Sequence, residues 1–105
     1  MAALLAGKVA AITGGVTGIG RAIALEYLRQ GANVAVNHFG DASSEEHFKS
    51  MLKEVPEGTR LIAVPGDISK QETATKLVKE AVDAFGKLDV FVSNAGVCQF
   101  AEFLS

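Results

Sequence analysis

Glycines cluster between residues 14 and 20 of this 105-residue chain, directly after the apolar run Val9–Ile12. A helical pattern begins at Ile19. A glycine backbone turns tightly and lets a diphosphate come close, because no side chain intervenes. The start of the following helix offers unpaired N–H groups and a partial positive charge to the anion. Strand, glycine turn and helix together predict a phosphate-binding turn.

Three other interpretations of the glycines can be compared with this one. A Walker A loop requires Lys-Ser/Thr after its last glycine, whereas Gly20 is followed by Arg21 and Ala22, so that motif is excluded. The dinucleotide pattern Gly-x-Gly-x-x-Gly also fails literally, because the spacing is Gly14-x-x-x-Gly18-x-Gly20. A structural turn without a ligand stays open on these residues alone.

Three further apolar runs, 32–36, 60–64 and 88–93, each lead into polar or glycine residues. They are followed by Asn37-His38 in a loop that extends to Asp41, by Asp67 and by Asn94-Ala95-Gly96. Continuous apolar runs of this length are typical of buried parallel strands. In open parallel sheets, ligands bind beyond the carboxyl ends of the strands. All four groups of residues would therefore lie at one ligand-binding edge.

Helical patterns separate the four predicted strands. The first spans about 18–30 and is stopped by Gly31. The second begins with a capping box at Ser43 and buries Phe48, Met51, Leu52 and Val55. The third begins with a capping box at Ser69, buries Ala74, Leu77, Val78, Ala81 and Phe85, and ends at Gly86. This alternation predicts an α/β fold, a doubly wound parallel sheet with right-handed crossovers.

The composition sets broad limits on function. The chain can form at most one small domain, and a net charge of −2 gives no electrostatic reason to bind nucleic acid or an anionic membrane. Cys98 is the single cysteine, which suits a reducing, cytoplasmic compartment. No apolar run approaches the ~18 residues of a membrane span. Residues 1–6 lack the features of a signal peptide.

Three motifs in register resemble those of the short-chain dehydrogenase/reductase family, over essentially the whole chain. Thr13-Gly14-Gly15-Val16-Thr17-Gly18-Ile19-Gly20 is similar to its cofactor motif Thr-Gly-x-x-x-Gly-x-Gly. Gly66-Asp67-Ile68-Ser69 resembles its adenine-contacting segment, and Ser93-Asn94-Ala95-Gly96 resembles its Asn-Ala-Gly motif. The resemblance implies a Rossmann-type dinucleotide-binding portion over 1–105, with strand order 3-2-1-4, that is incomplete relative to the family domain.

The resemblance also implies roles for single residues. The loop with Gly14, Thr17, Gly18, Ile19 and Gly20 would hold the diphosphate of NAD or NADP. Asp67 would accept from the adenine amino group, and the Ile68 backbone would frame the ring. Asn94 would lie beside the adenosine ribose, with Ala95 and Gly96 close to the cofactor. A helix cap for Asp67 and a strand-tying turn for Asn94 are the alternatives.

The residues that end the second strand bear on the choice of cofactor. NAD binders usually place an acid there, which holds the ribose 2′-hydroxyl. Asn37 carries no charge that repels a 2′-phosphate, and His38 offers a donor or, when protonated, a charge. We therefore expect NADP, with NAD as the alternative, and expect Asn37→Asp to shift preference towards NAD. Asp41 is either a delayed ribose acid or a turn or capping residue.

No catalytic residue and no metal ligand is assigned. The family's Tyr-x-x-x-Lys pair is missing, since the single tyrosine, Tyr27, is followed four residues later by Gly31 and is expected to pack. The resemblance implies hydride transfer between nicotinamide and a small alcohol, polyol, sugar or ketone, and a homo-oligomer for the full-length enzyme. A non-catalytic dinucleotide-binding module, or a fragment of a split assembly, is the rival hypothesis.

The fourth strand would form an apolar, unpaired edge in this order of strands. Such an edge invites pairing with another chain. We therefore expect the isolated polypeptide to be marginally stable, to associate through that edge, or to be part of a longer enzyme.

Overall fold

Short strands alternate with helices along residues 4–94, the part of the chain that this computed structural model describes. The elements are β1 (Val9–Ile12), α1 (Gly18–Arg29), β2 (Asn33–His38), α2 (Ala42–Leu52), β3 (Leu61–Pro65), α3 (Gln71–Phe85) and β4 (Val90–Val92). Gly31 and Gly86, both with positive φ, follow α1 and α3, as the sequence predicts. Within residues 4–94, no helix has the length and apolar character needed to cross a membrane.

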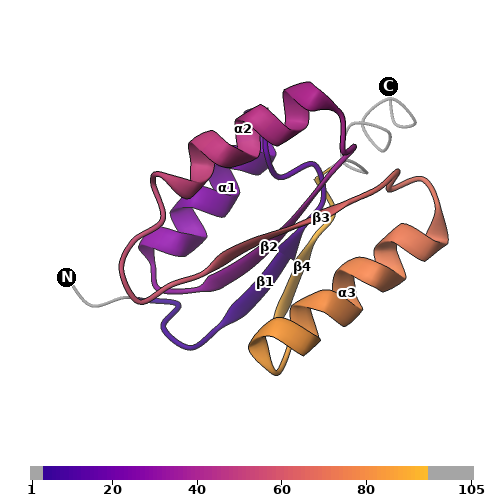
Figure 1. The fold of residues 1–105 in the computed structure, drawn as a ribbon. Coiled ribbons are helices and arrows are strands. Elements are labelled where there is room, and N and C mark those ends of the chain that lie inside the picture. The colour runs from indigo at the N-terminus through magenta and orange to yellow at the C-terminus, as the bar shows by residue number, and fades with distance from the viewer. Residues whose placement is uncertain (1–3, 95–105) are drawn as a thin grey trace, which may run out of the picture.

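The four strands form one parallel sheet in the order β3-β2-β1-β4 (Figure 1). Ala11 is paired with Ala35 on one side and with Phe91 on the other. Because all strands run in the same direction, their carboxyl ends meet along one edge of the sheet, which we call the carboxyl edge. The doubly wound α/β fold and the strand order 3-2-1-4 are confirmed.

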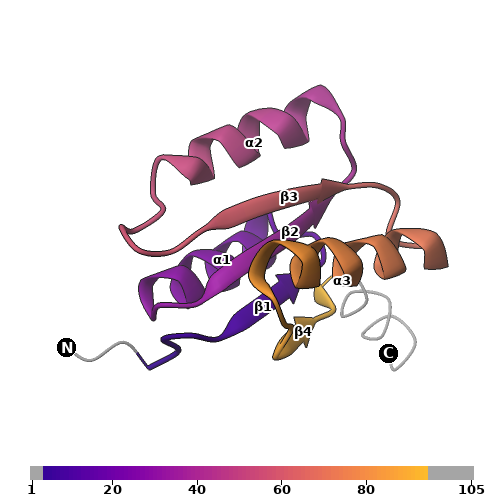
Figure 2. The ribbon, with the colours of Figure 1, turned by 60° about the horizontal axis from the view of Figure 1, so that its bottom comes forward.

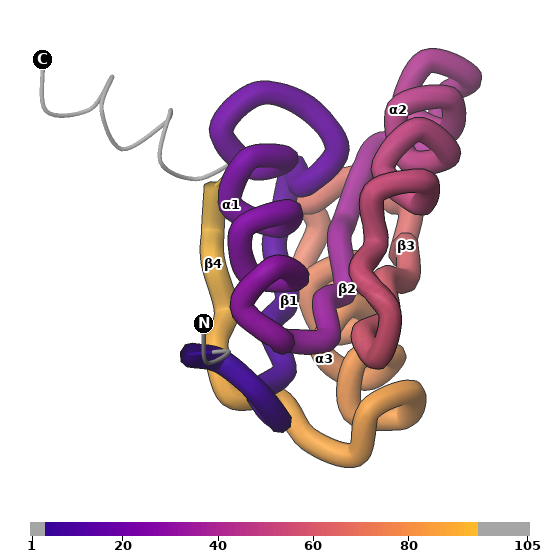
Figure 3. Tube along the Cα trace, turned by 90° about the vertical axis from the view of Figure 1, so that its left-hand side faces the viewer, coloured from indigo at the N-terminus to yellow at the C-terminus, as the bar shows by residue number. Residues whose placement is uncertain are grey.

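The helices cover the sheet in two layers, with α1 and α2 on one face and α3 on the other (Figure 2). The same division is visible along the Cα trace in Figure 3. Under α1 and α2, the core is built from large apolar side chains that include Ile12, Leu28, Val34, Val36 and Met51. These residues are essentially inaccessible to solvent, so this face supplies the larger share of hydrophobic stabilisation.

The face under α3 is lined by smaller side chains. Its core consists of Ala11, Ala35, Val64, Leu77 and Ala81. Alternate residues of a strand point to opposite faces, which is why Ala11 and Ile12 belong to different layers. Alanine on both sheet and helix lets α3 lie close to the strands.

Several element boundaries differ from the sequence prediction. The second strand extends through His38, so Asn37 and His38 lie in β2 and not in a loop. They continue the ladder because Asn37 is paired with Val64 and His38 with Pro65. Polar side chains can be buried at the end of a strand when they have hydrogen-bond partners. Hydropathy does not record such partners, so the sequence prediction ended the strand too early.

Both predicted capping boxes are wrong. The N-cap of α2 is Asp41, whose side chain accepts from the Ser44 N–H, so this helix begins before Ser43. The N-cap of α3 is Lys70, which makes no side-chain capping bond. Ser69 lies before this N-cap, and its N–H and its hydroxyl both donate to Asp67.

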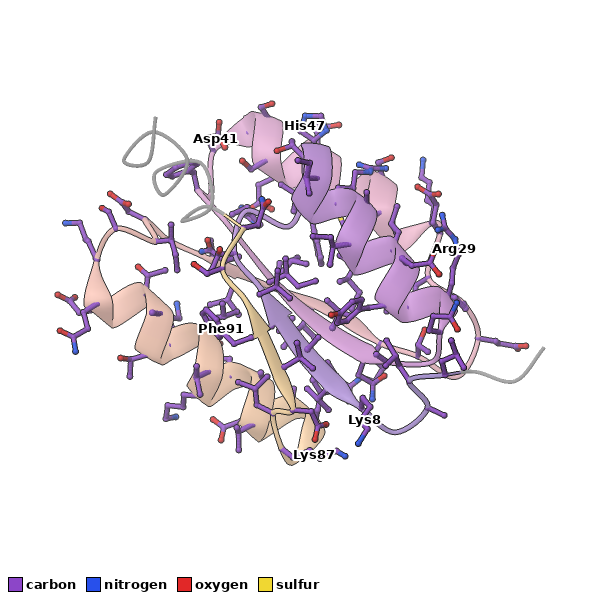
Figure 4. The ribbon with its side chains drawn as sticks, turned by 180° about the vertical axis from the view of Figure 1, so that it is seen from behind. Lys8, Arg29, Asp41, His47, Lys87 and Phe91 are labelled. Carbon is purple, nitrogen blue, oxygen red and sulfur yellow. The ribbon has the colours of Figure 1, made fainter. Side chains whose placement is uncertain are left out.

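Apolar side chains are exposed where α3 meets β4. Val78, predicted to be buried, is 37% exposed, and Val82 and Phe91 are 39% and 42% exposed. Figure 4 shows Phe91 on the α3 side of β4. A groove of about 590 Å³ runs between Phe91 and the α3 residues Ala74 and Val78. Among the described strands β4 pairs only with β1, so its other side is the predicted apolar edge.

Candidate functional site

The glycine loop connects β1 to α1 at the carboxyl edge and is fixed by backbone hydrogen bonds on both sides. The Thr13 N–H donates to the Val92 carbonyl at 3.0 Å, and the Gly15 N–H donates to the Asn37 carbonyl at 3.0 Å. Gly14 adopts a φ of 60°, which a side chain would disfavour. The loop is therefore held between β4 and β2, with its central residues projecting beyond the sheet.

Two glycines of the loop pack too tightly to carry a side chain. A Cβ on Gly20 would overlap the Gly14 carbonyl oxygen and would lie 2.7 Å from the Asn94 amide nitrogen. A Cβ on Gly15 would lie 2.6 Å from Val36 Cγ1 in the core. The spacing of glycines thus lets the first turn of α1 rest directly on the loop backbone.

The N-terminus of α1 opens onto this loop. Thr17 is its extended N-cap residue, its hydroxyl makes no capping bond, and the first turn contains no acidic residue. Thr17, Gly18 and Ile19 are exposed, with Ile19 at 72%. First-turn N–H groups without a side-chain acceptor, next to a glycine backbone, suit a phosphate-sized anion.

Asn94 joins the end of β4 to the glycine loop. Its Nδ2 donates to the Gly14 carbonyl at 3.3 Å, and the contact is partly buried. The strand-tying alternative for Asn94 is therefore what the structure shows, while contact with a ribose stays a prediction. The predicted cofactor residues Ala95 and Gly96 lie outside the described residues.

Asp67 lies on the exposed loop that follows β3. Its Oδ1 accepts from the Ser69 hydroxyl at 2.7 Å and from the Ser69 N–H at 2.9 Å. The bonds from the hydroxyl and then the N–H of Ser69 lower the pKa of this carboxyl, so it is ionised near neutral pH. Within the described residues Oδ2 has no partner, and it can accept from a ligand amino group. Ile68, next in the chain, is half-buried.

Asn37 is buried, with 2% of its surface exposed, and its amide is already engaged. Nδ2 donates to the Gly66 carbonyl at 3.0 Å and to the Val64 carbonyl at 3.1 Å. The amide therefore ties β2 to the exit of β3, while its donation to a 2′-phosphate stays a prediction. A carboxylate at this position would face two carbonyl oxygens, and the shift of preference towards NAD in Asn37→Asp stays a prediction.

His38 is also buried, with 4% of its surface exposed. Its Nδ1 accepts from the Gly40 N–H at 2.9 Å, and its ring lies 6.2 Å from that of Phe48 in α2. Contact between His38 and a ribose phosphate stays a prediction, although Nδ1 already has a partner.

Asp41 and Arg21 lie near the site, and their side chains bind α2 and the residues that follow it. Asp41 caps α2, so the capping alternative is confirmed for it. The Arg21 guanidinium donates to Ser50 Oγ and to Glu54 Oε2, both at 3.1 Å, and holds α1 against the far end of α2. Sequence reasoning missed this contact, because the partners are separated by a strand and most of a helix. Tyr27 packs against the larger core, as expected.

Comparison with known proteins adds family relationships to this geometry. A family model described as short chain dehydrogenase matches residues 8–105. The L-rhamnose-1-dehydrogenase of Scheffersomyces stipitis is 53% identical over 105 residues, which cover 99% of this chain and 41% of that protein. The L-rhamnose 1-dehydrogenase (NAD(P)(+)) of a Sphingomonas species is 47% identical, over 96% of this chain and 39% of that protein.

Among solved structures, a short chain dehydrogenase from Mycobacterium smegmatis superposes with a TM-score of 0.77 at 31% identity. The match covers 88% of this chain and 38% of that one. The chain therefore spans about two fifths of the length of the curated relatives it matches.

Proposed function

The chain belongs to the short-chain dehydrogenase family, and we propose that it forms the cofactor-binding portion of an NAD(P)-dependent sugar dehydrogenase. One observation carries the proposal. The glycine loop is anchored to β2 and β4, and a Cβ on Gly20 would collide with its backbone. A loop built this tightly beneath a helix N-terminus fits a dinucleotide diphosphate.

The other cofactor contacts that we propose lie along the same carboxyl edge. We propose that Gly14, Thr17, Gly18, Ile19 and Gly20 surround the diphosphate. The ionised Asp67 accepts from the adenine amino group through its unpartnered Oδ2, and the Ile68 backbone borders the ring. Asn94 lies beside the adenosine ribose, with Ala95 and Gly96 following it.

Charge at the end of β2 supports use of NADP, with NAD as an alternative. Asn37 carries no charge, and the Asp41 carboxylate is engaged as the cap of α2. Asn37 and His38, which end β2, therefore offer no carboxylate to hold a 2′-hydroxyl or to repel a 2′-phosphate. A relative named as NAD(P)(+)-dependent is consistent with both cofactors.

The substrate class rests on the names of two relatives. Both are named L-rhamnose 1-dehydrogenases, so we propose an aldose sugar as the substrate of the complete protein. When bound, nicotinamide supplies the acceptor for a hydride from a sugar carbon. The described residues position the nucleotide and keep its charged groups paired, and none of them is assigned to proton transfer.

The test is nucleotide binding together with sugar-dependent turnover of the intact protein. We expect NADP⁺ to bind, and L-rhamnose to give reduced nicotinamide, followed by its absorbance. Asp67→Asn should weaken binding, because an amide accepts less strongly from the adenine amino group. Failure of both NADP⁺ and NAD⁺ to bind would refute the proposal.

A non-catalytic dinucleotide-binding module is the second candidate. It agrees with the placement of Tyr27, which is partly buried and packs against the larger core. Tight nucleotide binding without oxidation of any sugar would support this alternative.

We further propose that the full-length enzyme is a cytoplasmic homo-oligomer, in line with the single cysteine and with family members in general. Sedimentation velocity on the intact protein and cell fractionation test the two parts of this proposal.

A further inference from the structure

The turn between β2 and α2 is closed by a side chain of the strand itself. The Gly40 N–H donates to Nδ1 of His38 at 2.9 Å, and Gly40 has a φ of 88°. The next residue, Asp41, fixes the start of α2 by accepting from the Ser44 N–H. The short segment 39–41 is therefore held at both ends, and Phe39 between them is 74% exposed.

The imidazole that closes this turn is itself fixed. His38 is 4% exposed, and its ring lies 6.2 Å from the Phe48 ring of α2, tilted by 33°. Its carbonyl accepts from the Gly66 N–H at 2.8 Å, one residue before Asp67. His38 thus connects the exit of β2, the exit of β3 and α2 through its backbone and its ring.

We propose that His38 is a positioning residue for nucleotide binding, and that its neutral imidazole holds the 39–41 turn in place through the Gly40 N–H. The inference rests on the proposed function, since it concerns how the same carboxyl edge is shaped for the nucleotide. It assigns His38 an indirect role, in place of direct contact with a ribose phosphate.

The chemistry of imidazole makes this contact dependent on protonation. Neutral histidine has one acceptor nitrogen, whereas both nitrogens of the imidazolium are donors. Protonation therefore turns the acceptor towards Gly40 into a second donor, and two N–H groups cannot remain in contact. The turn then loses the bond that ties Gly40 to the ring.

The charges near His38 are few. Asp41, at the start of α2, is an acidic group that interacts with His38. Hydrogen bonds from Ser44 chiefly lower the pKa of the Asp41 carboxyl, and the charge interaction with His38 lowers it slightly further. The flanking strands β1 and β3 carry no charged residue, and Phe48 on α2 is apolar.

Two variants distinguish the loss of the hydrogen-bond acceptor at Nδ1 from the loss of the packed ring. In His38→Asn, Oδ1 takes a position close to that of Nδ1 and accepts at every pH, although the ring is lost. In His38→Phe, the ring still packs against Phe48 but the acceptor is gone.

The experiment is calorimetric titration of the intact protein with NADP⁺ at pH 8, together with amide hydrogen exchange of Gly40. We expect His38→Phe to bind about tenfold more weakly than wild type at pH 8, the worth of one hydrogen bond, with faster hydrogen exchange at Gly40 after correction for the intrinsic rate. His38→Asn should bind as wild type does and should keep the protection of Gly40.

Equal affinity of wild type and His38→Phe at pH 8, with unchanged protection of Gly40, overturns this inference and leaves the proposed function intact. Absence of NADP⁺ binding by wild type at pH 8 defeats the proposed function, and this inference with it.

Discussion

Replacing Gly20 with alanine tests whether the loop and the first turn of α1 are built as one unit. Gly20 lies inside α1, where alanine would ordinarily stabilise a helix by about 1 kcal/mol. Here the added Cβ overlaps the Gly14 carbonyl oxygen and lies 2.7 Å from the Asn94 amide. Because the first obstacle is backbone, it cannot swing away as a flexible side chain would.

The magnitude follows from these opposing effects. Overpacking costs about 1–3 kcal/mol, and displacing the Asn94 donor from the Gly14 carbonyl costs about 1 kcal/mol more. After the gain in helix propensity, Gly20→Ala should lower the free energy of unfolding by about 1–3 kcal/mol. Nucleotide affinity should fall as well, because the displaced Gly14 carbonyl belongs to the loop that receives the diphosphate.

Urea denaturation and NADP⁺ titration of the same preparations measure the two effects. Gly58→Ala is the control for a glycine-to-alanine change without overpacking, since a Cβ there meets nothing within 4 Å, although Gly58, unlike Gly20, has a positive φ of 87°. The control should lose about 1–2 kcal/mol to backbone strain and bind nucleotide normally. A Gly20→Ala protein that is more stable than wild type and binds NADP⁺ equally well would refute the packing argument.

Four further predictions concern the edges of the same site. Asn37→Asp should cost about 2–3 kcal/mol of stability in denaturation, because a buried carboxylate would face two carbonyls; retained stability would contradict the observed bonds. Asn94→Ala should lose about 1 kcal/mol and weaken NADP⁺ binding in titration, whereas an unchanged affinity would limit Asn94 to tying strands. The pKa of the Asp41 carboxyl is lowered below its ordinary value of 3.8, chiefly by Ser44. Its stabilising effect should therefore be complete above about pH 4 and be lost as the pH falls through the lowered value. Thermal melts should show a smaller acid-induced loss in Asp41→Asn, which still caps, and equal losses would argue against the cap. Phe91→Lys should reduce self-association of the isolated 105-residue polypeptide in sedimentation, and an effect of similar size from Lys on an exposed residue of α2 would point to general charge instead.

The order of strands and helices could be predicted because it depends on local patterns. Continuous apolar runs identified β1 and β3, and Gly31 and Gly86 marked the ends of α1 and α3. Right-handed crossovers then restricted the sheet to few topologies. The tying role of Asn94 was also open to sequence reasoning, since the residue directly follows an apolar run.

The details at the carboxyl edge could not be predicted, because they depend on contacts between distant segments. Asn37 looks like a loop residue until the Val64 and Gly66 carbonyls are placed beside it. Ser69 looks like a helix cap, but the helix begins one residue later than a cap at Ser69 requires, and the Ser69 side chain binds Asp67. Single-sequence patterns describe neighbours along the chain, whereas these hydrogen bonds form across strands or compete within a turn.

The two faces of the sheet are packed with side chains of different size, so they should tolerate substitutions to different degrees. Under α1 and α2 the side chains are large and aliphatic, so a smaller residue at one position can be compensated by a larger residue at a neighbouring position. Ala11, Ala35 and Ala81 hold α3 at a distance that any added methyl group would increase. Descendants of this chain should therefore diversify under one pair of helices while keeping the opposite side nearly fixed.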